Sequence, residues 1–147
     1  MNDERRKLLH AILSRGPMTE AMLRRRLRDR GFEESEADEC VRYARESGMT
    51  DDDMYSRLFV EGHPEWGNRR IIDDLKRRGV PGGAIRRALD ERDPAEEDAA
   101  YRLCRDLAER GLGKETIVPR LLRRGFSLSM AGEAAERACS GKERPVK

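Results

Sequence analysis

The sequence is poor in aromatic and apolar side chains. Of its 147 residues, three are Phe, three are Tyr and one is Trp, and only 37% are hydrophobic while 41% are charged. So small an apolar fraction excludes most β-sandwiches and does not suffice for one thick core. No stretch of ten residues is free of charge or strong polarity, which predicts neither a membrane-spanning helix nor a secretory signal.

Cysteine and histidine are too few and too scattered to indicate a metal site, a disulfide framework or a catalytic group. Cys40, Cys104 and Cys139 form no CxxC pair, and we expect each to be a reduced thiol that packs within a helix in the cytoplasm. His10 and His63 lie far apart and have no nucleophile motif beside them. The sequence also lacks a phosphate-binding glycine loop and an HExxH motif, so we expect no enzyme, no metal and no cofactor.

The net charge is close to zero. A balance of 31 basic and 29 acidic residues gives +2, which provides no general attraction to nucleic acid or to an anionic membrane. Electrostatic binding therefore requires local segregation of charge along the chain.

The sequence repeats itself at a shift of just under fifty residues. Three segments then coincide without gaps, and in each a glycine is preceded by an aliphatic residue at eight and at four positions and directly by arginine. Aliphatic spacing of four that ends at glycine predicts a short helix with a left-handed C-terminal cap. The three glycines are Gly31, Gly79 and Gly125.

Further amphipathic patterns precede and follow each of these segments, so each repeat is predicted to contain three helices. No segment alternates apolar and polar residues over more than a few positions, which excludes a sheet. The sequence therefore predicts an all-α fold of three tandem three-helix repeats. The predicted ranges are 1–49, 50–92 and 93–140, followed by a flexible tail at 141–147.

Polar residues that can cap a helix lie at the predicted helix starts. Pro119 follows Ile117 by two positions, so the last basic helix is expected either to begin late or to have an irregular first turn. The predicted capping residues are Thr19, Asp51 or Asp52, Asp93 before Pro94, and Ser127 or Ser129.

Basic residues concentrate on the middle helix of each repeat, whereas acidic residues concentrate elsewhere. The helix dipole explains carboxylates at helix N-termini, but it does not explain Arg69 and Arg70 in the first half of a helix. Repeats stacked in one orientation would align these arginines into a surface for phosphate or an acidic partner. Aromatic residues are absent from the same helices, so stacking of bases is not expected, and Trp66 is expected to pack between helices rather than to anchor a partner.

These residues resemble the RecX family of bacterial recombination regulators over nearly the whole chain. The segments that carry the resemblance are TEAMLRRRLRDRGF, DDDMYSRLFVEGHPEWGNRRIIDDLKRRGV and LLRRGFSLSMAGEAAE. The central segment is the most specific, since it has the family's order of Asp53, Tyr55, Gly67, Arg69, Arg70, Ile71, Asp74, Leu75, Gly79 and Val80.

The resemblance implies an elongated, curved array of helical repeats that binds the RecA recombinase filament on DNA and restrains its ATPase, strand exchange and growth. A repeating ligand suits a repeating binder, and we expect a monomer that contacts the filament and the DNA within it. Glu61, His63 and Glu65 stand where the family often has basic residues, which favours protein contact over DNA contact there. The expected binding residues are Arg24, Arg25, Arg28, Arg69, Arg70, Arg77, Arg123 and Arg124.

Two other functions fit the same basic helices. One is a helical module that binds DNA directly, for which affinity should fall steeply with salt even without a recombinase. The other is a helical-repeat scaffold that holds an acidic protein unrelated to recombination.

Overall fold

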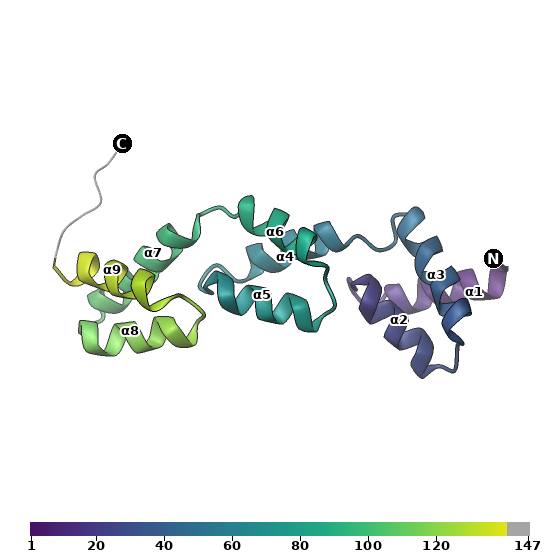
Figure 1. Ribbon diagram of the computed structural model, residues 1–147, viewed down its shortest axis with the longest axis horizontal. Helices are drawn as coiled ribbons and strands as arrows, with labels where there is room; N and C mark the ends of the chain where they lie inside the picture. Colours follow the sequence, from purple (N-terminus) through teal and green to yellow (C-terminus); the bar gives the residue numbers. More distant parts are fainter. Residues whose placement is uncertain (141–147) are drawn as a thin grey trace. The chain divides into compact units, whose positions relative to one another are not determined.

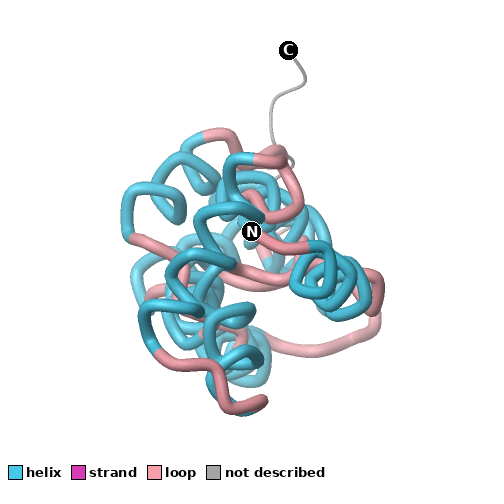
Figure 2. The backbone as a smooth tube through the Cα atoms, turned by 90° about the vertical axis from the view of Figure 1, so that its right-hand side faces the viewer, coloured by secondary structure: helices cyan, strands magenta, loops and turns pink. Residues whose placement is uncertain are grey.

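The computed structural model describes residues 1–140, and all regular structure within them is helical (Figure 1). Nine helices and no strand occur in this range, which confirms the all-α prediction; Figure 2 shows only helices and connecting loops. The predicted tail, residues 141–147, lies outside the described residues. The helices are α1 (Asp3–Leu13), α2 (Glu20–Asp29), α3 (Glu34–Glu46), α4 (Asp52–Gly62), α5 (Asn68–Arg77), α6 (Gly82–Asp90), α7 (Glu96–Glu109), α8 (Lys114–Arg123) and α9 (Leu128–Cys139).

Three predicted capping residues begin helices as expected. The hydroxyl of Thr19 accepts a 3.1 Å hydrogen bond from a first-turn N–H of α2, and that of Ser127 accepts one of 3.2 Å in α9. The carboxylate of Asp51 does the same for α4 at 3.0 Å. Each of these bonds satisfies an N–H group that a helix leaves without a partner at its N-terminus.

The predicted glycine caps are also present. The φ angles of Gly31, Gly79 and Gly125 are +93°, +79° and +95°, and each glycine lies two positions after the last residue of α2, α5 or α8. These left-handed conformations turn the chain sharply after each of the three basic helices.

Two expectations about helix starts are wrong. α7 begins at Glu96 after Ala95, whose extended ψ of 157° delays entry into the helix, so Asp93 does not cap it. α8 begins at Lys114 and continues through Pro119 rather than starting late. Pro119 and the residue four positions before it are both exposed, so water can replace the hydrogen bond that proline cannot donate.

The chain divides into two compact units. Unit 1 contains residues 1–58 and 75–88, and unit 2 contains residues 59–74 and, within the described part of the chain, 89–140. α4, α5 and α6 therefore each begin in one unit and end in the other. The division into three repeats stays a prediction, because the helices assigned to the middle repeat are shared between the two units.

Each unit has its own apolar core. α3 packs against α1 and α2 in unit 1, whereas α9 packs against α7 and α8 in unit 2. The buried cluster of unit 1 consists of Leu9, Ile12, Met18, Leu23, Leu27, Ala37, Cys40, Val41 and Ala44. That of unit 2 consists of Ala99, Ala100, Leu103, Cys104, Leu107, Ile117, Leu121, Phe126, Ala131, Ala134 and Ala135.

The cysteines do not all pack as predicted. Cys40 and Cys104 are fully buried, but Cys139 is exposed at the end of α9. The prediction of a packed thiol is wrong for Cys139 because it lies at the last position of its helix, beyond the buried stripe of α9.

Candidate functional site

In unit 1, the N-terminus of α2 joins the C-terminus of α5. Thr19 is fully buried, and besides capping α2 its hydroxyl donates a 2.6 Å hydrogen bond to the carbonyl of Arg78. The carboxylate of Asp52, the first residue of α4, accepts a 3.0 Å hydrogen bond from the N–H of Glu20, the first residue of α2. An N–H group at the start of α2 is thus satisfied by α4, and the cap of α2 is tied to the residue that follows α5.

In unit 2, the N-terminus of α5 joins the C-terminus of α8 in the same way. The N–H of Gly67 donates a 2.8 Å hydrogen bond to the carbonyl of Arg124. The carboxylate of Glu96, the first residue of α7, accepts a 2.6 Å hydrogen bond from the N–H of Asn68, the first residue of α5. This joint therefore occurs once in each unit, at equivalent positions; the carbonyl accepts from the hydroxyl of Thr19 in unit 1 and from the backbone N–H of Gly67 in unit 2.

Close backbone packing accompanies both joints. A Cβ atom at Gly79 would lie 2.2 Å from the Cβ of Ala21, and one at Gly125 would lie 2.5 Å from the Cβ of Arg70. No side chain fits at Gly79 or Gly125. Glycine is therefore required at both positions for the close approach of the neighbouring helix as well as for the positive φ angle. Rigid backbone contacts in each unit thus hold the ends of the basic helices.

Trp66 lies in a stack of side chains at the start of α5. His63 lies parallel to one face of the indole, with ring centroids 3.8 Å apart and planes at 16°. The guanidinium carbon of Arg70 lies 3.7 Å from the indole centroid, and the ring of Phe59 meets Trp66 edge-on at 5.9 Å. Trp66 therefore packs, as predicted, and the residues stacked on it leave it unsuited to stacking on a base.

Arg92 holds the loop between α4 and α5, a role that the sequence did not indicate. Its guanidinium donates 2.6 Å hydrogen bonds to the side-chain oxygen of Asn68 and to the carbonyl of Trp66, and a longer one of 3.3 Å to the carbonyl of Pro64. Burial lowers the pKa of Arg92, and the charge of Glu96 opposes that effect. This arginine lies among acidic residues in the sequence, where it resembles an ordinary surface charge.

The structure brings part of the predicted binding set together at the joint of unit 2. Nη2 of Arg69 donates a 3.4 Å hydrogen bond to the carbonyl of Leu122, and Nη1 of Arg124 lies 2.5 Å from Oε2 of Glu65. Arg70 is engaged by Trp66. These arginines are therefore oriented by neighbouring groups of the same unit.

In unit 1, the predicted arginines differ in their engagement. Arg24 on α2 forms an ion pair with Asp38 on α3, which neutralises part of its charge. Arg25 and Arg28 on the same helix are exposed, and neither has a hydrogen bond or ion pair among the residues described. Arg77 is exposed and has a partner.

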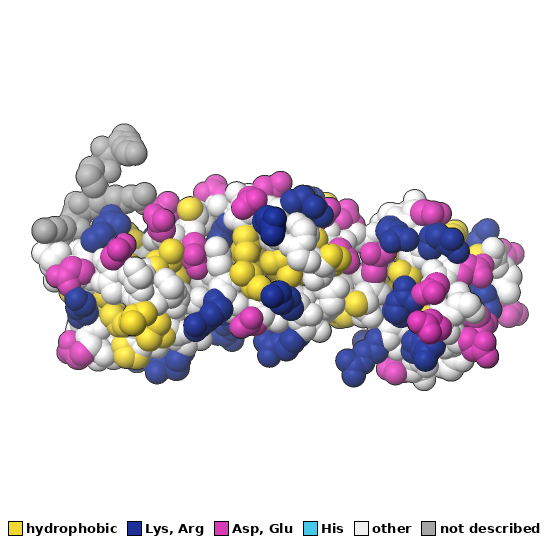
Figure 3. Space-filling model, in the orientation of Figure 1, with side chains coloured by type: hydrophobic (Ala, Val, Ile, Leu, Met, Phe, Trp, Pro, Cys, Tyr) yellow, Lys and Arg dark blue, Asp and Glu magenta, His cyan; other side chains and the backbone are white. Residues whose placement is uncertain are grey.

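Arg123 on α8 in unit 2 is exposed and, within residues 1–140, has neither a hydrogen bond nor an ion pair. On the face drawn in Figure 3, basic and acidic side chains are interspersed. Basic and acidic side chains are therefore not separated over this face as a whole. The arginines that can bind a partner are the exposed ones without an ion pair, namely Arg25, Arg28 and Arg123.

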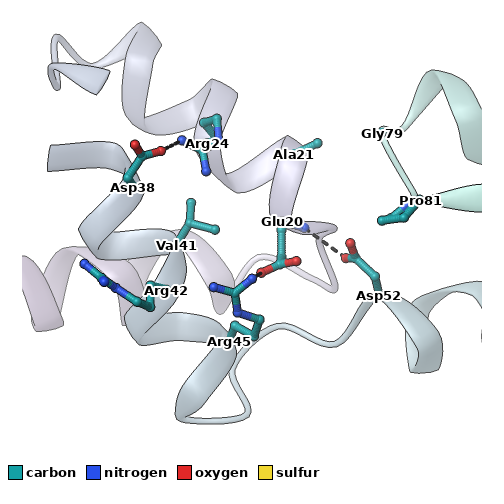
Figure 4. A pocket seen from close by; sticks show the side chains of 10 residues that line it. All are labelled: Glu20, Ala21, Arg24, Asp38, Val41, Arg42, Arg45, Asp52, Gly79 and Pro81. Carbon is teal, nitrogen blue, oxygen red and sulfur yellow. Dashed lines mark hydrogen bonds and ion pairs between the residues drawn. The ribbon is translucent and has the colours of Figure 1, made fainter. Parts of the chain in front are cut away.

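A hollow of about 520 Å³ in unit 1 lies beside Arg24 (Figure 4). Arg42 and Arg45 of α3 also line it, together with the carboxylates of Glu20, Asp38 and Asp52, and Arg45 lies 3.3 Å from Glu20. The walls thus carry both signs of charge. The sequence indicated Asp52 only as a possible helix cap and did not indicate Glu20, because an acid near a helix start also fits the helix dipole.

Residues 11–43 match a family model described as RecX, first three-helix domain. The chain is 32% identical to "Regulatory protein RecX" of Thermobifida fusca over 130 residues, covering 82% of this chain and 70% of that protein. It is 34% identical to the protein of the same name from Thermus thermophilus over 124 residues, covering 84% of each. The chain belongs to the RecX family of regulatory proteins. The sequence-based recognition is therefore confirmed.

Solved RecX structures share the fold. The crystal structure of RecX from Lactobacillus salivarius superposes with a TM-score of 0.79 at 19% identity and covers 92% of this chain and 94% of that one. A second crystal structure, of regulatory protein RecX, gives 0.73 at 20% identity and covers 91% of this chain and 74% of its own. Within residues 1–140, no helix is long and apolar enough to cross a membrane.

Proposed function

We propose that this RecX-family chain is a non-enzymatic regulator that binds the RecA–DNA filament and inhibits its ATPase, strand exchange and growth. It acts as a monomer without a cofactor in the cytoplasm. The resemblance to RecX supports RecA as the partner, and the family membership supports a regulatory role.

The observation that carries the proposal is the placement of unpaired arginines on helices whose ends are fixed. Arg25, Arg28 and Arg123 lie exposed on α2 and α8, and none of them has a partner among the described residues. The guanidinium group presents several N–H donors in a plane, which suits carboxylate and phosphate alike. A filament repeats such groups along its length, so two arginine-bearing helices can bind it together.

Contact with protein fits the site better than contact with unpaired bases. Trp66 is the only tryptophan, and it is engaged by His63 and Arg70. With Trp66 engaged in this way, DNA binding would depend mainly on phosphate contacts, and these weaken steeply with salt.

The test compares binding to naked single-stranded DNA with binding to the same strand coated by RecA, with ATP hydrolysis measured in parallel over a salt series. We expect tighter binding to the coated strand, inhibition of hydrolysis, and a shallow salt slope in the absence of RecA. Equal affinity for both strands with unchanged hydrolysis would refute the proposal. A steep salt slope on naked DNA would favour a direct DNA-binding module.

The residue assignment has its own test. Reversing the charge at Arg25 and Arg28 together should weaken filament binding about tenfold or more, since each contact with a charged partner contributes on the order of 1 kcal/mol. A matched double reversal at Arg86 and Arg102, exposed on α6 and α7, should leave binding unchanged. Circular dichroism of both double variants checks that neither has lost helical structure. Equal weakening of binding by both would contradict the assignment.

A further inference from the structure

A second hollow in unit 1 lies where α2, α4 and α6 begin. It has a volume of about 400 Å³ and adjoins the hollow of Figure 4, with which it shares Glu20, Arg45, Asp52 and Pro81. Thr50, directly before α4, also lines it. None of the arginines assigned to filament binding lines this cavity.

Two buried oxygen atoms on the cavity wall lack hydrogen-bond partners. Thr50 is only 4% exposed, and its Oγ1 has no partner. Oε1 of Glu20 is also buried without a hydrogen bond, although Nη1 of Arg45 lies 3.3 Å from it. Buried polar atoms are nearly always hydrogen-bonded, and leaving one unpaired destabilises the fold. The carboxylate oxygen of Glu20 can only accept a hydrogen bond, so it requires a donor, and the hydroxyl of Thr50 is able to accept one as well.

The cavity also has an excess of negative charge. Glu20, Asp51, Asp52 and Asp53 face it, whereas only two guanidinium groups line it, those of Arg45 and Arg87. Arg87 is held by Asp53 through hydrogen bonds of 2.9 and 3.1 Å to one carboxylate oxygen, and Arg45 lies beside Glu20. Among the described residues, Asp51 and Asp52 accept hydrogen bonds only from backbone N–H groups, and neither forms an ion pair there.

The pKa of the Asp52 carboxyl group is raised, chiefly by burial and in addition by its acidic neighbours. Burial raises its pKa, and the charges of Asp51 and Asp53 raise it further, against the hydrogen bond from the N–H of Glu20 and the charge of Arg45. A cation in the cavity would supply the opposite charge that Asp52 lacks.

The shape of the acidic wall favours a large cation over a metal ion. Within residues 1–140 no group of three or more acidic, histidine or cysteine side chains converges closely enough to hold a metal. A guanidinium group has five N–H donors spread over a plane and can reach separated acceptors at the same time.

Two exposed apolar side chains on α4, the helix whose first residues line the cavity, favour a cation that is part of a polypeptide. Met54 and Leu58 on α4 are 45% and 50% exposed, one turn apart and immediately after the three aspartates. Arg57 donates to the sulfur of Met54 at 3.8 Å and leaves the rest of that side chain open. A free small cation would leave both side chains in water, whereas a peptide with an aliphatic residue next to its arginine would cover them.

We infer that this cavity binds an arginine side chain of a protein partner, whose neighbouring aliphatic residues cover Met54 and Leu58. The guanidinium donates to Glu20 and Thr50 and offsets the charge of Asp52. The site is separate from the arginines of the proposed function, and it does not require that the partner be RecA.

The test uses the isolated chain and a short probe, acetyl-Leu-Arg-Leu-amide, with binding followed by NMR shifts of the backbone amides of residues 50–53. The matched probe carries citrulline, which keeps the shape of arginine but has no charge. We expect saturable shifts with the arginine peptide and binding at least about tenfold weaker with the citrulline peptide. Equal binding of both peptides, or no shifts at residues 50–53, would overturn the inference.

Variants test the named atoms. Thr50→Val and Asp52→Asn preserve the shape of each side chain, and each should weaken the arginine peptide about fivefold or more. Asp38→Asn removes a carboxylate that lines the hollow of Figure 4 but not this cavity, and it should have no effect. If Asp38→Asn weakens binding as much as the other two changes, the site is not this cavity.

Agmatine distinguishes a free cation from a polypeptide. It carries the same guanidinium group without flanking leucines, and we expect it to bind much more weakly than the peptide. Equal affinity would show that Met54 and Leu58 contribute nothing and would refute a protein partner. These tests contain no recombinase and no DNA. A negative result would therefore refute the arginine-binding cavity and would leave the proposed binding to the filament unaffected.

Discussion

The carboxylate of Asp52 accepts a 3.0 Å hydrogen bond from the N–H of Glu20 and so caps a helix to which it does not belong. Glu96 does the same for Asn68 in unit 2. A carboxylate at the first position of one helix therefore has two roles, since it fits the dipole of its own helix and also satisfies the N-terminus of another.

Asp52→Asn should leave the protein at least as stable as the wild type at pH 7. The amide oxygen of asparagine can still accept from Glu20, while the penalty of burying a charge disappears. Because the folded-state pKa of Asp52 is raised, its ionisation destabilises the folded state as pH rises through that value. The advantage of the variant should therefore vanish below the ordinary aspartate pKa of about 3.9, where both side chains are neutral.

Urea unfolding of both proteins at pH 7 and pH 3 checks this. A variant less stable at pH 7 by about 1 kcal/mol or more would mean that the charge itself stabilises the fold.

Gly31→Ala and Gly125→Ala form a matched pair at equivalent repeat positions. Both glycines have left-handed φ angles, +93° and +95°, so alanine at either position costs about 1–2 kcal/mol. The space around Gly31 is open, whereas a Cβ at Gly125 would lie 2.6 Å from the backbone nitrogen of Arg70. Gly125→Ala should therefore lower the free energy of unfolding by about 1–3 kcal/mol more than Gly31→Ala.

Denaturant titrations read by circular dichroism give both values. The fluorescence of Trp66, next to Gly67 in the affected joint, should change in the folded state only for Gly125→Ala. Equal losses of stability in the two variants would contradict the close packing at Gly125.

The sequence predicts much of this fold because the decisive signals are local. The aliphatic spacing before Gly31 and Gly125 and the hydroxyl of Thr19 determine helix ends from within a few residues. The partners across the joints could not be predicted in this way. Nothing near Asp52 in the sequence indicates that its oxygen accepts a hydrogen bond from Glu20, since that bond depends on the folded path of the chain between them.

The candidate site was predictable to a smaller degree. Sequence placed arginines on the right helices, but it could not tell those with an acidic partner, such as Arg24, from those without one, such as Arg25. Whether an arginine of α2 has an acidic partner depends on which residue of α3 packs next to it in the folded structure. Arg92 was missed for the related reason that its acceptors are mostly backbone carbonyls of a distant loop.

Arg92→Ala should destabilise unit 2 by about 2–4 kcal/mol, because it leaves the carbonyl of Trp66 and the side chain of Asn68 without their donor. Arg86→Ala, at an exposed position of α6, should change stability by less than about 0.5 kcal/mol. Urea unfolding monitored by Trp66 fluorescence measures both effects. A similar small loss for both variants would show that the loop does not depend on Arg92.

The three cysteines should react with thiol reagents at very different rates. Burial raises the pKa of Cys104 to about 12, and it also raises the pKa of Cys40, so both remain neutral thiols near pH 8. Cys139 is exposed and meets reagent directly. We expect one fast-reacting thiol in the native protein, identified as Cys139 by peptide mass, and three after denaturation. Rapid native labelling of Cys104 would mean that the core of unit 2 opens readily, since a thiolate forms there only when water reaches the sulfur.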